Sequence, residues 1–257
     1  MRYFTARTFL PAALTGVAIL AIWQAASLAG LLPAASIPSM VNTVDELGHQ
    51  VTDASFWVAV GETMRGWALG LAVAVVIAIP LGFLLGMIPA LRQSCTVIVE
   101  FLKPIPPVAL IPLALLLWGP SLRMELFLVA FGALWPIFTN VLYGVLAVDP
   151  LAIDMARSYR LSHTRTIRSI VVPSVLPFVT TGLRLAASIA LIIAVVAELI
   201  GGSPGLGKAI IDAETGNALP EMYADIIVTG ILGLAISALF STIERPFLHW
   251  HASGRGA

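Results

Sequence analysis

Long apolar runs separated by short polar stretches make up most of the chain. A helix that crosses a bilayer needs about 20 mostly apolar residues. Open sheet edges cannot lie unpaired in lipid, so each run is expected to be helical. The pattern predicts an all-α membrane protein with six transmembrane helices in one domain, residues 1–257, with spans at about 10–30, 67–91, 97–118, 125–147, 176–200 and 225–245.

The third run is interrupted by prolines. Pro104, Pro106, Pro107 and Pro112 lie inside it, and each one removes an amide donor and clashes with the preceding turn. The entrance to this span is therefore predicted to be kinked. Irregular backbone is tolerated at membrane depth only where protein or a water-filled cavity covers it, so we expect this run near the interior of the bundle.

Two weaker patterns add detail outside and between the spans. Pro38-Ser39 followed by Val41, Val44, Leu47 and Val51 indicates an amphipathic helix within 33–66, either on the membrane surface or packed against other helices. Glycines four residues apart, at 66 and 70 and again at 82 and 86, allow close helix approach.

The composition agrees with a membrane protein. The chain is 59% hydrophobic and 11% charged, whereas soluble domains have roughly 25% charged residues. The single Cys95 excludes an intramolecular disulfide and a cysteine-based metal cluster. No pair of catalytic carboxylates and no nucleophile–base set stands out, so we expect a non-enzyme with no cofactor, no metal and no nucleic-acid partner.

The distribution of Lys and Arg predicts the orientation. With the N-terminus in the cytoplasm, eleven basic residues fall on the inner side and three on the outer side. This bias follows the positive-inside rule. Both termini and the loop at 148–175 are then expected in the cytoplasm.

That loop holds an island of charge, DMARSYRLSHTRTIRSIVVP at 154–173, with Arg157, Arg160, Arg165 and Arg168. Pro150 can open a first short helix, and Ser162 can cap a second one that ends near Ile170. Pro173 is expected to start the fifth span. On physical grounds alone, the loop is either a rigid protrusion or an ordinary basic inner loop.

The island resembles the cytoplasmic motif of bacterial ABC importer permeases, which reads Glu-Ala-Ala, three residues, Gly, nine residues and Ile-x-Leu-Pro. The matching positions are Asp154-Met155-Ala156, Arg160, Ile170, Val172 and Pro173. Stretches such as KPIPPVALIPLALLLWG at 103–119 and AELIGGSPGLGKAI at 197–210 are similar to the subfamily for sulfonates, taurine, nitrate and bicarbonate.

The resemblance implies the type I importer architecture and a permease in the bacterial inner membrane that carries a small anion such as a sulfonate, taurine or nitrate. It implies four kinds of partner: two ATPase subunits, an external substrate-binding protein, a second permease copy and the lipid bilayer. The residues that it assigns to ATPase coupling are Asp154, Met155, Ala156, Arg157, Arg160, Leu161, Ser162, Ile170 and Pro173.

Two rival functions stay open. Related permeases serve vitamin precursors or aromatic compounds, and a self-contained secondary transporter or channel is an alternative of another class. Arg160 replaces the motif glycine. We expect residue 160 to be helical, with the turn moved to Leu161–Ser162.

Polar residues elsewhere have two interpretations each. Glu198 is either a hydrogen-bonded structural carboxylate or a residue of the translocation pathway. Thr139 and Asn140 either bond between helices or line the pathway, and Gln24 is interpreted in the same way. The stretch at 202–208 fits G-x-x-x-x-G-K, but Ala209 follows Lys208 where a phosphate-binding loop has Ser or Thr. We therefore predict a structural turn there.

Overall fold

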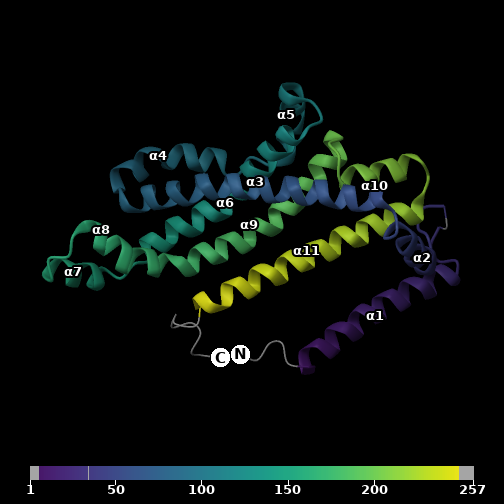
Figure 1. Cartoon of the computed structure of the whole chain (residues 1–257), viewed down its shortest axis with the longest axis horizontal. Helices are drawn as coiled ribbons and strands as arrows, with labels where there is room; N and C mark the ends of the chain where they lie inside the picture. The colour runs from purple at the N-terminus through teal and green to yellow at the C-terminus, as the bar shows by residue number, and fades with distance from the viewer. Residues whose placement is uncertain (1–5, 34, 249–257) are drawn as a thin grey trace.

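The computed structural model describes residues 6–33 and 35–248, and within them it contains helices and loops but no strand (Figure 1). The described residues form eleven α-helices, one 3₁₀-helix (η1) and one π-helix (η2). Their bounds are α1 Ala6–Leu28, α2 Met40–Gln50, α3 Ala54–Met87, α4 Pro89–Leu102, η1 Pro107–Leu110, α5 Ile111–Trp118, α6 Leu122–Leu146, α7 Pro150–Ser158, α8 His163–Thr166, η2 Ile167–Val171, α9 Val172–Gly201, α10 Leu206–Thr215 and α11 Leu219–Leu248.

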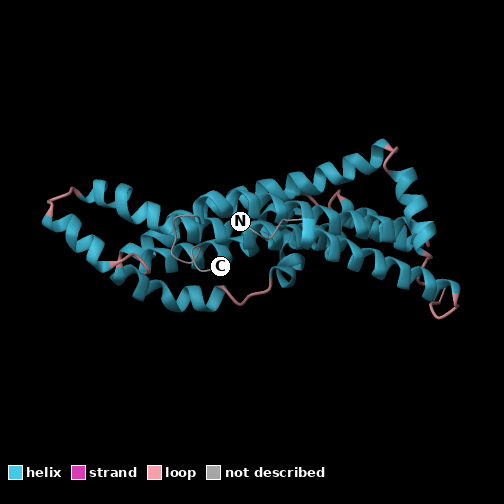
Figure 2. Cartoon of the chain, turned by 90° about the horizontal axis from the view of Figure 1, so that it is seen from below, coloured by secondary structure: helices cyan, strands magenta, loops and turns pink. Residues whose placement is uncertain are grey.

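The helices form an elongated bundle (Figures 1 and 2). Helices α3, α6 and α9 supply most of the buried side chains, and α11 packs against α9. Helices α7 and α8 lie at one end of the bundle, and α2 and α10 lie at the other (Figure 1). The two polar ends are therefore built from different loops, separated by the length of the apolar core.

Four helices among the described residues are long and apolar enough to cross a membrane: α3, α6, the continuous helix His163–Gly201 and the segment Leu219–Glu244 of α11. The bent pair α4 and η1–α5 makes a fifth if it is counted as one span. The predicted first run lies in α1, which contains the apolar segment Leu14–Leu28. The described part thus carries four or five candidate spans. The ends of the chain, predicted to be cytoplasmic, lie outside the described residues.

The second predicted span is longer than the pattern indicated. Helix α3 begins at Ala54 instead of 67, because Asp53 caps it by accepting a hydrogen bond from the Ser55 backbone N–H (3.0 Å). That bond lowers the pKa of the Asp53 carboxyl below its usual range. Charged residues in the added turns pair with each other, since Arg65 lies 3.4 Å from Glu62. The apolar stretch marks the lipid-facing length, and the helix extends beyond it.

The prolines break the third run as predicted. Helix α4 and the segment Pro107–Trp118 are bent by 78°. The predicted interior position is wrong for α4, which has no buried residue. The second half contributes the buried Ile111 and Ala114 of α5, whereas α4 contacts the core only through partly buried residues, Leu91, Cys95 and Val99. The bend explains the difference, because it directs the two halves along different faces of the bundle.

Small residues bring α3 and α6 together, as the glycine spacing predicted. A Cβ added at Gly70, Gly82 or Gly86 would meet Val129, Val141 or Val145 at 2.5–2.7 Å. Every partner is 59 positions further along the chain, so the two helices run parallel and in register. Ala74 and Ala78 fill the gap between the glycine pairs and are fully buried. Small residues on one helix thus let the other approach closely.

The predicted amphipathic helix is α2. Ser39 caps it by accepting from the Asn42 N–H (3.2 Å). Val41 and Val44 remain exposed, while α2 contacts α1 and α11. Gln24 makes the interhelical bond that was one of its two interpretations, because its Oε1 accepts from the Val41 N–H (3.2 Å).

We predict that Gly82→Ala lowers the free energy of unfolding by about 1–3 kcal/mol, because the new methyl group would overpack the α3–α6 contact against Val141. Thermal unfolding of the purified chain in detergent measures the effect. Gly61→Ala in the same helix is the control, since nothing lies within 4 Å of a Cβ there. Equal melting temperatures for the two variants would contradict the packing argument.

Candidate functional site

Helix α7 carries the first half of the charged island. Asp149 caps it by accepting from the Leu151 N–H (2.8 Å), and Pro150 occupies the first turn, where its missing donor costs least. The predicted short helix is confirmed. Ala156 is buried, and Ile153 packs against the core. One face of α7 is thereby fixed to the bundle.

The opposite face of α7 is open. Leu151, Met155 and Tyr159 recur every four residues and are 65%, 52% and 75% exposed. Asp154 lies beside this stripe and forms an exposed ion pair with Arg157 (3.1 Å). We call Leu151, Asp154, Met155 and Tyr159 the outer face of α7. An exposed apolar stripe with a charge at its edge is typical of a surface that contacts another protein.

The prediction for Arg160 is wrong. It is not helical but has a positive φ of 52°. The Leu161 N–H donates to the Ala156 carbonyl, and the Arg160 N–H donates to the Arg157 carbonyl, both at 2.9 Å. This pair of bonds is the Schellman ending, in which a left-handed residue terminates the helix. The backbone keeps the turn at position 160 although the residue there is Arg instead of Gly.

The second half of the island begins as predicted and continues differently. Ser162 caps α8 by accepting from the Arg165 N–H (3.4 Å). The helix does not stop near Ile170. It passes through the π-turn η2 and joins α9, so Pro173 lies within a continuous helix instead of at its start. A proline ring clashes with the carbonyl four residues earlier, and a widened turn relieves such a clash.

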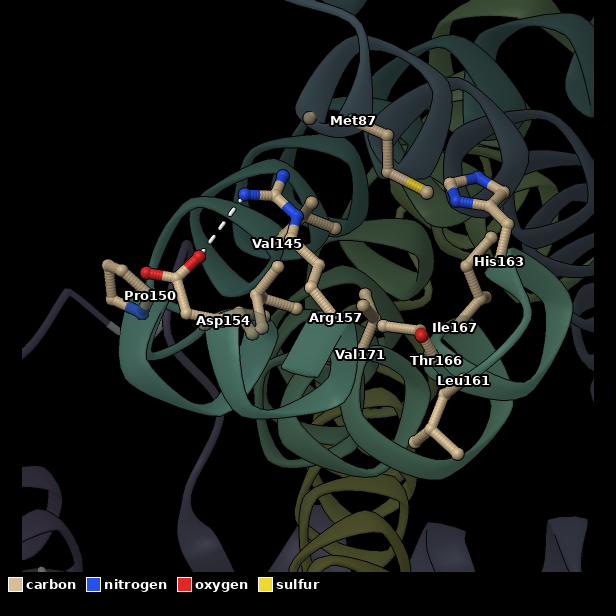
Figure 3. Close-up of a pocket in the computed structure, with 13 residues that line it drawn as sticks. Met87, Val145, Pro150, Asp154, Arg157, Leu161, His163, Thr166, Ile167 and Val171 are labelled. Carbon is tan, nitrogen blue, oxygen red and sulfur yellow. Dashed lines mark hydrogen bonds and ion pairs between the residues drawn. The ribbon is translucent and has the colours of Figure 1, made fainter. Parts of the chain in front are cut away.

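The island carries four arginines. Arg157, Arg160, Arg165 and Arg168 are all exposed. Figure 3 shows Arg157 and Asp154 side by side at the rim of a cavity of about 550 Å³. Met87 of α3, Val145 of α6 and Ile167 of η2 line the cavity. The charged island therefore surrounds a hollow into which the ends of α3 and α6 project.

At the opposite end, Glu198 lies fully buried in a set of hydrogen bonds. Its Oε2 accepts from Thr63 Oγ1 (2.9 Å) and from the Gly207 N–H (2.8 Å), and Thr63 Oγ1 accepts from the Leu206 N–H (2.8 Å). We call Thr63, Glu198, Leu206 and Gly207 the outer clasp. The outer clasp joins α3, α9 and α10. Glu198 thus has the hydrogen-bonded surroundings of a structural carboxylate, one of its two interpretations.

The stretch at 202–208 supplies one side of this clasp. Its glycines let the chain fold over Glu198, because a Cβ at Gly205 would overlap the carboxyl group and one at Gly207 would lie 2.8 Å from Glu198 Cβ. Gly202 ends α9 with a left-handed φ of 73°. The helix before it and the absence of a strand in the described chain agree with the predicted turn.

Thr139 and Asn140 do not bond between helices. Thr139 Oγ1 donates to the Trp135 carbonyl (2.8 Å), and Asn140 Nδ2 donates to the Pro136 carbonyl (2.8 Å), both within α6. Asn140 instead packs against Gly182 of α9. Glu198, Thr139 and Asn140 are not brought into one site, and their role in a pathway stays a prediction.

The sequence patterns missed two partners of these sites. Thr63 lies before the predicted second span and Glu125 at the first residue of the predicted fourth span, and both are buried. Glu125 covers Gly66, where a Cβ would overlap its carboxyl group. The sequence did carry a signal for Glu125. Gly66 belongs to the four-residue glycine spacing, so a residue of another helix was expected to pack against it, and that residue is Glu125.

A bundle of apolar helices with a charged protrusion at one end defines a multi-pass integral membrane protein. Residues 78–247 match the family described as the binding-protein-dependent transport system inner membrane component. The chain belongs to this family. It is therefore a permease subunit of an ABC importer in the inner membrane, and a transmembrane subunit without catalytic activity.

Known proteins agree with this assignment. The chain is 27% identical to the putative aliphatic sulfonates transport permease protein SsuC of Bacillus subtilis, over 93% of this chain and 86% of the relative. It is 27% identical to the nitrate import permease protein NrtB of Leptolyngbya laminosa, over 93% and 88%. The fold matches a chain of the inward-facing MetNI methionine ABC transporter, with a TM-score of 0.65, 20% identity and coverage of 76% and 99%.

We predict that Arg160→Gly raises the free energy of unfolding by about 0.5–1 kcal/mol, because glycine adopts positive φ without the steric cost that arginine has. The greater freedom of glycine in the unfolded chain offsets part of the gain. Thermal unfolding in detergent measures it. Ser158→Gly, in the last turn of α7, should lower stability instead, and a loss of stability in both variants would contradict the assignment of Arg160 to the turn.

A second prediction concerns the outer clasp. Gly205→Ala should lower the melting temperature, because its methyl group would overlap the Glu198 carboxyl. The loss should be smaller in a Glu198→Ala background, where the carboxyl is gone. Gly230→Ala is the control, since its Cβ would meet nothing within 4 Å. Equal losses with and without Glu198 would show that the two residues do not interact.

Proposed function

We propose that the chain is the permease subunit of an ATP-driven importer that carries a small anion, such as a sulfonate, taurine or nitrate, across the inner membrane. It works as a homodimer with two ATPase subunits and an external substrate-binding protein. The observation that carries the proposal is the outer face of α7, an exposed apolar stripe beside Asp154 on a helix whose other face is fixed to the bundle.

The geometry suggests how ATP hydrolysis on another subunit reaches this chain. The outer face of α7 contacts the ATPase, and Arg165 and Arg168 contact its surface or anionic lipid. A displacement of α7 passes to α3 and α6 through the cavity wall formed by Ile153, Met87 and Val145. It also passes to α9 directly, because α8, η2 and α9 are one helix.

A six-span topology is part of the proposal. It counts α1 as the first span and the bent pair α4 and η1–α5 as the third. The α7 end then lies in the cytoplasm and the outer clasp lies outside. The bias of basic residues toward the α7 end supports this orientation. Binding-protein docking is then expected at the end formed by α2 and α10.

An anionic substrate is supported by the relatives, two of which are named for aliphatic sulfonates and nitrate. A permease for a vitamin precursor or an aromatic compound is the alternative within the class. A self-contained secondary transporter or channel is the alternative of another class.

We predict that Asp154→Arg abolishes co-purification with the ATPase subunit while the yield of the permease is unchanged. Its ion pair with Arg157 is exposed on both sides, and exposed pairs stabilise a fold by at most about 1 kcal/mol. The fold therefore tolerates the change, but a basic residue would stand where the partner meets a carboxylate.

Asp45→Arg in α2, an exposed position at the opposite end, is the control and should leave ATPase binding intact. Unchanged co-purification of Asp154→Arg would refute the contact. Uptake by the purified chain alone in vesicles, driven by an ion gradient, would instead support the secondary transporter.

A further inference from the structure

Two cavities adjoin at the end of α3. One is the cavity of about 550 Å³ beside α7, and the other has a volume of about 500 Å³. We call the second one the α3 cavity, and its lining residues are Pro80, Phe83, Leu84, Met87, Ile88 and His163. Met87 and His163 line both cavities, and Figure 3 shows their side chains next to each other. A single ligand could therefore occupy both.

The α3 cavity is apolar except for His163 and lies along a membrane span. Helix α3 is long enough to cross a membrane and ends at Met87, so the α3 cavity follows about the last two turns of this helix. Leu84 and Ile88 in its lining are exposed. Its volume is in the range of pockets that hold organic ligands. At this position in a bilayer, the apolar lining faces acyl chains.

The cavity beside α7 supplies polar groups at the end of the span. Arg157 and His163 lie on opposite sides of it in Figure 3. Asp154 accepts from Arg157 Nη1 only (3.1 Å), and a guanidinium has five N–H donors, so the others stay available. No described residue forms an ion pair with His163. Phosphate oxygens are strong acceptors for such donors, and arginine can bind them through two N–H groups at once.

The charged island around these cavities favours an anion. Arg160, Arg165 and Arg168 are exposed and have no ion pair within 4.0 Å among the described residues. The opposite end of the bundle has a cavity of about 490 Å³ whose lining includes five carboxyl residues, Glu46, Asp53, Asp212, Glu221 and Asp225. An anionic headgroup is therefore attracted to the α7 end and repelled from the α10 end. Basic pockets between transmembrane helices bind anionic lipid headgroups.

We propose that the two cavities together bind one anionic phospholipid of the membrane. Its phosphate group lies between Arg157 and His163, and one acyl chain lies in the α3 cavity against Phe83 and Leu84. A soluble phosphate would satisfy the polar groups but leave the apolar lining uncovered, so the pair of cavities fits a lipid better than an ion. The bound lipid connects α3 with α7 and α8. The site does not depend on which substrate the permease carries.

The test compares two lipids that have the same acyl chains and different headgroups. The full chain is purified in detergent, freed of lipid and titrated with dioleoyl phosphatidylglycerol, an anion, or with dioleoyl phosphatidylcholine, which has no net charge. Native mass spectrometry measures the bound lipid. Phosphatidylglycerol is expected to bind about tenfold more tightly. Equal affinity for the two lipids would overturn the proposal.

Removing the polar groups should abolish this preference. Arg157→Gln combined with His163→Gln should lower the affinity for phosphatidylglycerol about tenfold and leave that for phosphatidylcholine unchanged. Both side chains are exposed, so the fold tolerates the change, and the melting temperature without lipid verifies this. Arg123→Gln with His49→Gln is the control, since it removes the same two residue types away from the cavities. An equal effect of the two double variants would show general attraction of anions and overturn the site.

Leu84→Trp tests the position of the acyl chain. The larger side chain would fill the α3 cavity, so the affinity for phosphatidylglycerol should fall several-fold. Leu81→Trp is the matched control, because Leu81 lies on the same helix outside the lining and is 39% exposed, close to the 44% of Leu84. Equal affinities of these two variants would contradict the proposed site.

Competition separates a lipid from a soluble phosphate. Inorganic phosphate and glycerol phosphate carry the charged group without acyl chains, so neither should displace phosphatidylglycerol at an equal concentration. Displacement by either one would identify the cavity beside α7 as a site for soluble phosphate and overturn the proposal.

Discussion

The close approach of α3 and α6 is the constraint on which the rest of the structure depends. Glycines 66, 70, 82 and 86 lie against residues 59 positions later, which fixes two long helices in one register. Helix α9 then packs on this pair, with Gly144 and Gly182 at the contact with α6. In lipid, helices gain little from apolar burial and associate through close packing. The small residues therefore determine which helices form the core and which, like α4, pack at its edge.

Different interactions hold the helices together at the two ends of this core. At the α10 end, the clasp satisfies one oxygen of the buried Glu198 carboxyl group with Thr63 and the Gly207 N–H, which reduces the cost of burying that group. At the opposite end, α7 is held by apolar contacts of Ala156 and Ile153 and by the Schellman turn at Arg160. Hydrogen bonds connect three helices at the α10 end, whereas one full face of α7 stays open at the other end.

The sequence predicted what depends on local pattern. The helices, the proline break, the glycine contact and the Ser162 cap follow from residue type and spacing. Two features could not be obtained in this way. Arginine disfavours positive φ, so only the pair of hydrogen bonds from Arg160 and Leu161 reveals that the turn stays at Arg160. The outer clasp joins residues 135 and 143 positions apart, and periodicity within one helix carries no information on such pairs. Apolar length likewise marked the lipid-facing part of α3 but not its capped extension.

A single helix connects the cavity beside α7 with the outer clasp. The continuous segment His163–Gly201 carries Ile167 in the cavity beside α7 and Glu198 in the outer clasp. At Glu198 this helix is hydrogen-bonded to α3 and α10. Near its start, η2 is a π-turn, a form of helix that often occurs at functional sites. A displacement of α7 would therefore act on a helix whose far end is bonded to α3 and α10, so the bonds around Glu198 resist movement that begins at the other end of the bundle.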